Sequence, residues 1–242
     1  KPPSPWLPSL EGMPMRFELL PNGDRAIDVI FPNEISQEVS ANVLAMCAAV
    51  DAASHPGIVD CIPAYHTLLV EYDPAQLTYG QAAMWLRSLS FTAHSGTPGR
   101  TGTLPVCYGG AFGPDLDAVA VQAGLSAAEV VRLHTDAAYR VYMLGFRPGF
   151  PFLGGMNPRI ATPRRKTPRV RVEGGSVGIA GPQTGLYPEP SPGGWNIIGR
   201  TPVCLYDHQT LALFQPGDTL RFAAVSRDDY DRISEKGGWL LW

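Results

Sequence analysis

Hydrophobic and polar positions along the first third of the chain follow first the period of strands and then that of a helix. Residues 16–20 and 26–31 are rich in β-branched and aromatic side chains and flank the turn sequence PNGD, which predicts a β-hairpin. Over residues 36–53, apolar side chains recur three and four positions apart, the spacing of a helix with one buried face. The remaining elements are strands at 58–62 and 67–72 and a helix from Thr78 to about Leu89, opened by a capping box. This ββαββα order predicts a small two-layer α+β domain.

The pattern changes after a connection rich in Ser, Gly, Thr and Pro at residues 94–102. Beyond it, short apolar segments alternate with Gly and Pro turns, which is typical of a β-barrel or closed sandwich. The expected elements are strands at 104–108, 139–144 and 219–224, helices at 115–123 and 126–134, and a last helix that Ser226 caps and Gly237 ends. We therefore place a small α+β domain at 13–95 and a β-barrel domain at 103–242.

Composition supports a folded, β-rich protein. Of the 242 residues, 45% are hydrophobic and 17% charged, which excludes a disordered chain, and 26 Gly with 24 Pro indicate many turns. No apolar run reaches 18 residues, and the N-terminus lacks the order of a signal peptide, so we expect a soluble cytoplasmic protein. The Pro-rich lead at 1–12 carries no fold prediction. The apolar tail Trp239–Trp242 is expected to pack on the domain or to meet a partner.

The cysteines indicate a reducing compartment. Cys47, Cys61, Cys107 and Cys204 are far apart in the sequence, form no C-x-x-C pair, and mostly lie within apolar runs. We therefore expect four reduced thiols.

Positive charge is concentrated between Gly145 and Pro202. This segment holds eight basic and two acidic residues, a net charge of +6, whereas the whole chain carries −3 and the remainder therefore −9. The overall charge argues against a general nucleic-acid binder, and the local charge favours a site for an anionic small molecule.

Three glycine-rich motifs in this segment could build such a site. GFRPGFPFLGG at 145–155 combines a backbone fixed by Gly and Pro with three Phe side chains, which suits a rigid pocket or, equally well, a packed corner. GGSVGIAG at 174–181 contains the G-x-S-x-G pattern of a hydrolase nucleophile elbow, but Pro182 and Gly185 prevent the helix that an elbow needs. Glycines that bring backbone N–H groups close to a ligand are the favoured interpretation. SPGGWNIIGRTP at 191–202 places Arg200 and Thr201 at a strand end, with Trp195 expected in the core.

The run TPRRKTPRVRV at 162–172 supplies most of the charge. Guanidinium groups held on extended backbone bind carboxylate or phosphate in a bidentate manner, and Arg169, which enters a strand, is the first candidate for a ligand contact. A solvated basic loop or a docking face for an acidic partner explains the same cluster. Phosphate-loop, dinucleotide-binding and zinc-protease motifs are absent from the sequence, as is any His/Cys cluster at metal spacing, so no metal site is predicted.

Five motifs follow one another along the chain: GFRPGFPFLGG, TPRRKTPRVRVEGGSVGIAG, QTGLYP, SPGGWNIIGRTP and FQPGD. In this order they resemble the KipI family, also known as the B subunit of 5-oxoprolinase (PxpB) or as allophanate hydrolase subunit 1. GDRAIDVIF, IPAYHTLLVEYDP and the LHT around His134 extend the resemblance from about Phe17 to Phe222. The basic run TPRRKTPR is denser than the family pattern requires. The resemblance implies an α+β N-terminal domain followed by a mainly-β, cyclophilin-like barrel.

The resemblance also implies a function. Members act in an ATP-dependent 5-oxoprolinase complex that opens the lactam of 5-oxo-L-proline to give L-glutamate. The chain would be inactive alone and would work with a larger, KipA-like protein that corresponds to the C subunit of 5-oxoprolinase, and with a third, A-like subunit. ATP with Mg²⁺ would bind in the complex, and no biotin site lies in this chain. No nucleic acid or membrane partner is expected.

Combining the motifs with the resemblance yields candidate site residues. Cationic side chains would stabilise phosphoryl transfer to the amide oxygen. The candidate catalytic residues are His134, Arg147, Arg169 and Arg200, although a His at a helix end is more often a cap. The candidate substrate-binding residues are Phe146, Pro148, Phe150, Ser176, Gln183, Thr184, Tyr187 and Thr201.

Two alternatives remain open, because the family is functionally mixed. One is an inhibitor of a sensor histidine kinase, which the lack of a self-contained catalytic triad favours. The other is a carboxyltransferase component of a urea carboxylase or allophanate hydrolase system, with biotin carried by another protein.

Overall fold

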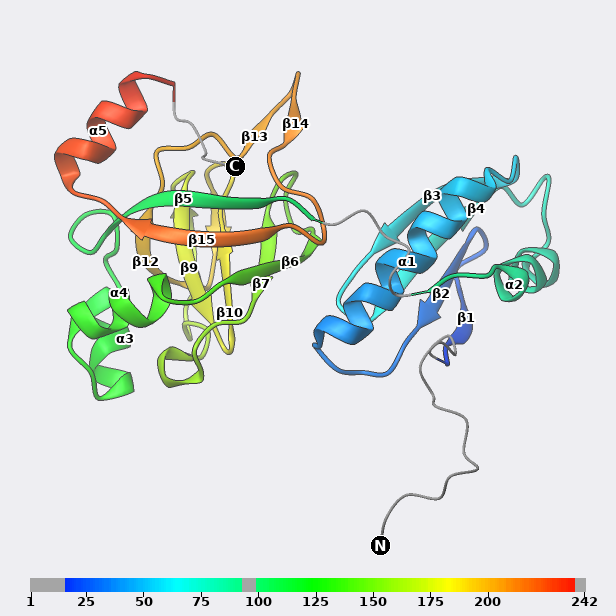
Figure 1. Cartoon of the computed structure of the whole chain (residues 1–242), viewed down its shortest axis with the longest axis horizontal. Coiled ribbons are helices and arrows are strands. Elements are labelled where there is room, and N and C mark those ends of the chain that lie inside the picture. Colours follow the sequence, from blue (N-terminus) through cyan, green and yellow to red (C-terminus); the bar gives the residue numbers. More distant parts are fainter. Residues whose placement is uncertain (1–15, 93–98, 238–242) are drawn as a thin grey trace, which may run out of the picture. The chain divides into compact units, whose positions relative to one another are not determined.

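A computed structural model describes residues 16–92 and 99–237 of the chain. The chain divides into two compact units, Lys1–Thr97 and Pro98–Trp242, which are treated separately below (Figure 1). The predicted Pro-rich lead, the apolar tail and most of the predicted connection lie outside the described residues. The first strand of the second unit begins at Thr101, two residues before the predicted domain start, because its pairing with a distant strand extends to that residue.

The N-terminal unit is an antiparallel four-stranded sheet in the order β1-β2-β4-β3, with two helices packed on it (Figure 1). One hydrophobic core joins the sheet to both helices, with Ile27, Met46 and Leu86 buried in it. Its elements are β1 (Glu18–Asn22), β2 (Ala26–Ile30), α1 (Gln37–Ala53), β3 (Ile58–Pro63), β4 (Thr67–Tyr72) and α2 (Tyr79–Ser88). The predicted ββαββα order is thereby observed.

Side-chain caps fix where these helices begin. The Ser36 side chain accepts a hydrogen bond from the Val39 N–H at 3.2 Å, at the start of α1. Thr78 and Gln81 form the predicted capping box at the start of α2. These caps satisfy backbone N–H groups that have no partner within the helix, which explains why the helix starts were visible in the sequence.

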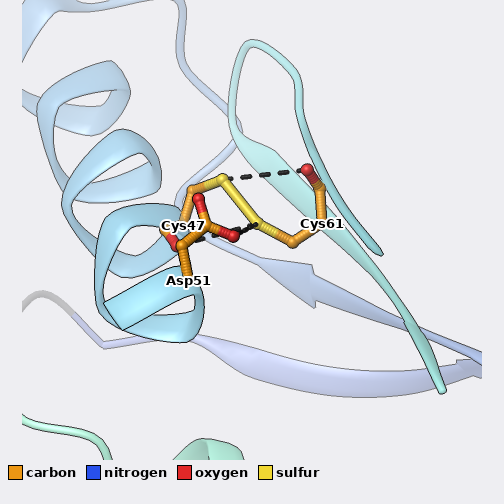
Figure 2. A group of neighbouring side chains, drawn as sticks. All are labelled: Cys47, Asp51 and Cys61. Carbon is orange, nitrogen blue, oxygen red and sulfur yellow. Dashed lines mark hydrogen bonds between the residues drawn. A yellow bond between two sulfur atoms is a disulfide. The ribbon is translucent and has the colours of Figure 1, made fainter. Parts of the chain in front are cut away.

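A disulfide joins α1 to β3 in this unit. Figure 2 shows the bond between Cys47 and Cys61, with the Asp51 carboxylate beside it. The prediction of four reduced thiols is therefore wrong for this pair, because folding brings α1 against β3 and places the two Cα atoms 6.2 Å apart. Cys107 and Cys204 are free thiols, as predicted.

The C-terminal unit is a closed seven-stranded barrel in the order β10-β7-β6-β15-β5-β12-β9 (Figure 1). The barrel strands are β5 (Thr101–Tyr108), β6 (Tyr139–Leu144), β7 (Pro151–Gly154), β9 (Ser176–Ala180), β10 (Gln183–Leu186), β12 (Asn196–Arg200) and β15 (Thr219–Ala224). The other elements are α3 (Leu116–Ala123), α4 (Ala127–Thr135), the 3₁₀ turn η1 (Pro158–Ile160), β8 (Arg169–Val172), β11 (Ser191–Gly193), β13 (Tyr206–Asp207), β14 (Leu211–Ala212) and α5 (Arg227–Glu235). The predicted fold class, an α+β domain followed by a mainly-β barrel, is confirmed.

The barrel closes through one parallel pairing of distant strands. β15 pairs with β5 along its whole length, from Thr219 opposite Thr101 to Ala224 opposite Val106. Next to this pairing, the buried Asp218 carboxylate accepts hydrogen bonds from the Arg100 backbone N–H at 2.9 Å and from its guanidinium at 2.6 Å. This ion pair fixes the register of the two strands, because it holds residues 118 positions apart at the start of the pairing.

Helices α3 and α4 pack on β12 and β15 and share the main hydrophobic core of the barrel. A second, smaller core cluster surrounds Phe150, Tyr187 and Trp195. Across residues 16–92 and 99–237, none of the helices has both the length and the apolar character needed to cross a membrane.

Candidate functional site

A pocket of about 330 Å³ lies beside the smaller core cluster of the barrel unit. Its walls combine aromatic rings, two arginines and backbone that carries little side chain. The lining residues are Phe146, Phe150, Phe152, Arg164, Arg165, Pro168, Tyr187, Pro192, Gly193, Gly194 and Trp195. We call this hollow the aromatic pocket. Two of the three glycine-rich motifs, at 145–155 and 191–202, contribute to it, as does the basic run at 162–172.

The rings of the wall pack edge to face. The Phe150 ring centroid lies 5.2 Å from that of Tyr187 and 5.6 Å from that of Trp195, both near perpendicular. Glycine makes this close packing possible, since a Cβ at Gly185 would lie 2.9 Å from both Phe150 and Trp195. A Cβ at Gly193 would lie against the Tyr187 hydroxyl. The wall is therefore rigid and depends on these two glycines.

The loop at 145–150 carries one aromatic ring to the mouth of the pocket. Its turn is closed by hydrogen bonds from the Phe150 N–H to the Arg147 carbonyl at 3.0 Å and from the Gly145 N–H to the Phe150 carbonyl at 3.2 Å. Phe146 lies in the left-handed region at φ 66°, and 61% of its surface is exposed. A β-branched or aromatic residue rarely adopts this conformation, and such strain is concentrated at functional sites.

Two arginines of the basic run are bound to a buried carboxylate. Asp115, at the start of α3, is 4% exposed and accepts hydrogen bonds from Arg169 at 2.7 and 2.8 Å and from Arg165 at 2.8 Å. The Ile197 N–H donates to the same carboxylate at 2.7 Å. The hydrogen bond to Asp115 raises the pKa of Arg169 above its usual value. These contacts hold the segment 162–172 against the barrel.

Arg164 differs from its neighbours. It lines the aromatic pocket, is exposed, and has no ion pair with a carboxylate within residues 16–92 and 99–237. Burial raises the pKa of the neighbouring Tyr187 phenol and outweighs the positive charges of Arg164 and Arg169, which act in the opposite direction. The Tyr187 phenol is therefore neutral at physiological pH and keeps its proton.

The Tyr187 hydroxyl can act as a donor toward the pocket. Tyr187 is 1% exposed, and its hydroxyl lies beside Gly193, which has no side chain to cover it. Since the phenol keeps its proton, the O–H can donate to a carbonyl or carboxylate oxygen in the pocket. The aromatic pocket therefore offers a cation without an ion pair among the described residues, Arg164, a second cation held by Asp115, Arg165, a neutral donor and flat apolar walls.

Three of the predicted substrate-binding residues meet at this pocket, namely Phe146, Phe150 and Tyr187. Pro148 lines a separate hollow formed by the same loop. Gln183 lies at the start of β10, half-buried. Ser176 and Thr201 are almost completely buried, and the Thr201 hydroxyl accepts a hydrogen bond from the Val203 N–H at 3.2 Å. None of these four lines the aromatic pocket.

His134 has a structural place inside the barrel unit. It is fully buried, with its ring stacked on Phe222 at 4.5 Å between centroids. The Thr184 hydroxyl donates to the Gly178 carbonyl at 2.9 Å, so it accepts from His134 Nε2–H at 3.0 Å. Nδ1 then accepts from the Tyr108 hydroxyl at 2.8 Å. Burial lowers the pKa of His134 to about 3, so the ring is neutral and both nitrogens are in use. The catalytic role predicted for His134 and the ligand contact predicted for Thr184 do not fit this arrangement.

None of the three arginines predicted as catalytic lines the aromatic pocket. Arg169 is bound to Asp115, as described above. Arg147 lies 3.5 Å from Glu189. Arg200 stacks its guanidinium 5.2 Å from the centre of the Phe112 ring, and its Nε is buried without a hydrogen-bond partner among the described residues. Their spacing in the sequence did not indicate which carboxylate or ring each would meet.

The G-x-S-x-G pattern forms no nucleophile elbow. Ser176 lies within β9, which is followed by strand β10 rather than by a helix. This agrees with the expectation drawn from Pro182 and Gly185.

Nothing in the sequence indicated that Asp115 binds Arg165 and Arg169, or that Arg164 is the arginine at the pocket without an ion pair among the described residues. Asp115 was assigned only to a helix start, and its side chain makes no capping hydrogen bond there. Trp195 was expected in the core, and it lies in the smaller core cluster at 6% exposure while also forming part of the pocket wall.

One group of metal-type side chains occurs in the part of the chain that the structure describes, and it consists of Cys47, Asp51 and Cys61 (Figure 2). Its two thiols are joined in a disulfide, so neither is a thiolate ligand. A single carboxylate remains, which does not suit Mg²⁺ with its six oxygen ligands.

Comparison with known proteins gives a consistent picture. The family described as "Carboxyltransferase domain, subdomain C and D" matches residues 17–214. The B subunit of 5-oxoprolinase from Bacillus subtilis (strain 168) is 41% identical over 239 residues, which cover 93% of this chain and 99% of that protein.

Two solved structures are similar as well. The crystal structure of TTHA0988 superposes with a TM-score of 0.76 at 41% identity and covers 84% of this chain, which spans 40% of that one. The K. lactis urea amidolyase superposes with a TM-score of 0.77 over 94% of this chain and 16% of its own. At 20% identity, the second likeness shows the fold alone.

Proposed function

This chain belongs to the family of the carboxyltransferase domain, subdomains C and D, and we propose that within this family it is the B subunit of an ATP-dependent 5-oxoprolinase complex. The observation that carries the proposal is the match to the B subunit of the B. subtilis 5-oxoprolinase, which extends over 99% of that protein at 41% identity. A match of this length leaves almost no part of the relative without a counterpart here.

The proposed reaction is the opening of 5-oxo-L-proline to L-glutamate. Water is added across the lactam C–N bond, and ATP is hydrolysed to ADP and phosphate to drive the step. The aromatic pocket supports this substrate, because it presents a cation and a neutral donor beside flat apolar walls.

The described residues of this chain do not suit Mg²⁺–ATP. The sequence has no phosphate loop, and the one group of metal-type side chains among those residues is closed by a disulfide. We therefore assign no phosphoryl-transfer step to the residues of this chain and propose that ATP binds on a partner subunit in the cytoplasm.

Further subunits are part of the proposal. A larger, C-like subunit and an A-like subunit would complete the complex. This chain spans 40% of the longer TTHA0988 chain, which supports the proposal that it works together with additional domains.

The test is reconstitution by omission. This chain is co-purified with its C-like and A-like partners, and glutamate and ADP are measured from 5-oxo-L-proline and ATP. Glutamate that forms with the full set and disappears when this chain is left out supports the proposal. An intact complex that forms no glutamate, or forms it equally well without this chain, refutes it.

A carboxyltransferase component is the second candidate, favoured by the name of the matching family. It predicts transfer of a carboxyl group from a biotinylated carrier to urea or a related amide. A purified biotin carboxylase and carrier that produce no carboxylated amide with this chain would remove it. Inhibition of a histidine kinase stays a prediction.

A further inference from the structure

We propose that the aromatic pocket binds the substrate as a small monocarboxylate with a flat uncharged body, whose carboxylate pairs with Arg164 and whose carbonyl oxygen accepts from Tyr187. This inference deepens the proposed function and rests on it for the choice of 5-oxo-L-proline as ligand. Arg164 thereby takes the place of Arg147, Arg169 and Arg200, which the motifs had suggested.

Most basic side chains of the segment 145–202 already have a partner. Arg165 and Arg169 are held by Asp115, Arg147 by Glu189 and Arg171 by Glu173, and Arg200 lies over the Phe112 ring. Arg159, Arg164 and Lys166 have no ion pair within residues 16–92 and 99–237, and of these only Arg164 lines the pocket.

The Asp115 carboxylate sets Arg164 apart from the two neighbouring arginines. Arg165 and Arg169 share the single carboxylate of Asp115, which is 4% exposed, so their attraction for an anion is reduced although the three groups together keep a net charge of +1. Of the two arginines that line the pocket, Arg164 is the one without an ion pair among the described residues, whereas Arg165 is held by Asp115. One guanidinium free to pair suits the carboxylate of a small acid, whereas a nucleoside triphosphate needs several such groups or a cradle of backbone N–H groups.

The second polar contact comes from Tyr187. Its hydroxyl lies beside Gly193 in the pocket lining, where a Cβ would meet it, and burial raises the pKa of the phenol so that it keeps its proton. A neutral O–H donor beside a guanidinium suits a carbonyl oxygen next to a carboxylate. Such a pair of oxygens, on one small ring, is what a lactam carboxylic acid presents.

The shape of the pocket suits the same ligand. Phe150 and Trp195 supply apolar faces, and Gly193 and Gly194 leave space where side chains would otherwise fill the cavity. Phe146, held at φ 66° at the mouth, is positioned to cover a bound ring. A cavity of about 330 Å³ accommodates a small cyclic acid with several water molecules.

The experiment measures binding of 5-oxo-L-proline to the full chain by isothermal titration calorimetry. The test variant is Arg164→Gln and the matched control is Lys166→Gln, which removes the same charge two residues away and outside the pocket. We expect Arg164→Gln to weaken binding about 10-fold or more and the control to change it less than about 2-fold, since a charge-assisted pair stabilises a ligand that much. Tyr187→Phe, which keeps the ring, is expected to weaken binding about 5-fold.

A ligand without the carboxylate provides an independent arm. 2-Pyrrolidinone should bind the wild-type chain about 10-fold more weakly than 5-oxo-L-proline and should bind Arg164→Gln as it binds wild type. Equal losses in Arg164→Gln and Lys166→Gln would overturn the inference. So would equal binding of the two ligands, no binding of 5-oxo-L-proline at millimolar concentration, or tighter competition by ATP than by 5-oxo-L-proline.

Failure of this inference can be told from failure of the proposed function. If the reconstituted complex releases glutamate and Arg164→Gln leaves its KM unchanged, the pocket assignment falls and the function stands. If no glutamate is released while the chain still binds the acid in an Arg164-dependent manner, the function falls and the pocket stands.

Discussion

Asp115 should be the carboxylate that holds Arg165 and Arg169 of the basic run against the barrel unit. It receives Arg165, Arg169 and the Ile197 N–H, and it is 4% exposed. Replacing it by Asn keeps an oxygen for the backbone donor but removes the charge that both guanidinium groups share. The side chain at position 115 then loses its ion pairs with Arg165 and Arg169.

The magnitude follows from burial. Removing one partner of a fully buried ion pair costs about 3–5 kcal/mol. Here the side chains of Arg165 and Arg169 are 35% and 25% exposed, so water can solvate them after the change. We therefore expect Asp115→Asn to lower the free energy of local opening by about 2 kcal/mol.

Native-state hydrogen exchange read by mass spectrometry is the assay, because the two units of the chain need not unfold together. A loss of about 2 kcal/mol accelerates exchange in peptides covering 162–172 and 196–200 by about 30-fold. The matched control is Asp117→Asn, an exposed carboxylate in the first turn of α3, for which about 0.5 kcal/mol is expected. Equal exchange rates in the two variants would refute the structural role given to Asp115.

Three further predictions concern the interior. Reducing the Cys47–Cys61 disulfide should lower the free energy of unfolding by about 3 kcal/mol, since the bond closes a loop of about 15 residues. Thermal melting with and without dithiothreitol measures the loss of stability. Rapid alkylation of both thiols in unreduced native protein would contradict the presence of the disulfide. Because burial lowers the pKa of His134 to about 3 in the folded chain, the unfolded chain takes up the proton at higher pH, and the free energy of unfolding should fall by about 1.4 kcal/mol per pH unit from about 6.5 toward 3. Urea titrations at about pH 7 and pH 4.5 should show a smaller pH dependence of stability for His134→Gln than for the wild type. An equal pH dependence in the two proteins would count against the buried neutral ring. Gly185→Ala should push the Phe150 ring out of the pocket wall and destabilise the barrel by about 1–3 kcal/mol, whereas a melting temperature equal to that of the wild type would show that the wall is not closely packed there.

Local patterns account for most of what the sequence predicted about the fold. Ser36, Thr78 and Ser126 cap the helices that they were expected to open. The order of elements followed because hydrophobic period and capping are short-range properties. The disulfide was not predictable, since Cys47 and Cys61 meet only when α1 packs on β3.

The site was predicted only in part for the same physical reason. Phe146, Phe150 and Tyr187 reach the pocket because Gly and Pro motifs restrict their backbone locally. The partners of the arginines are long-range, as with Asp115 and Arg169, which are 54 positions apart. A run of like charges gives no indication of which member will be neutralised, and here the exposed Arg164 rather than the strand residue Arg169 faces the pocket.

Whether this chain is a required component of a 5-oxoprolinase can be decided by titrating it into its partners. The initial rate of glutamate formation from 5-oxo-L-proline and ATP is measured at a fixed concentration of the C-like and A-like subunits. We expect a rate near zero without the chain that rises and saturates at a fixed molar ratio. A rate that does not depend on the added chain would show that the chain is not part of the enzyme.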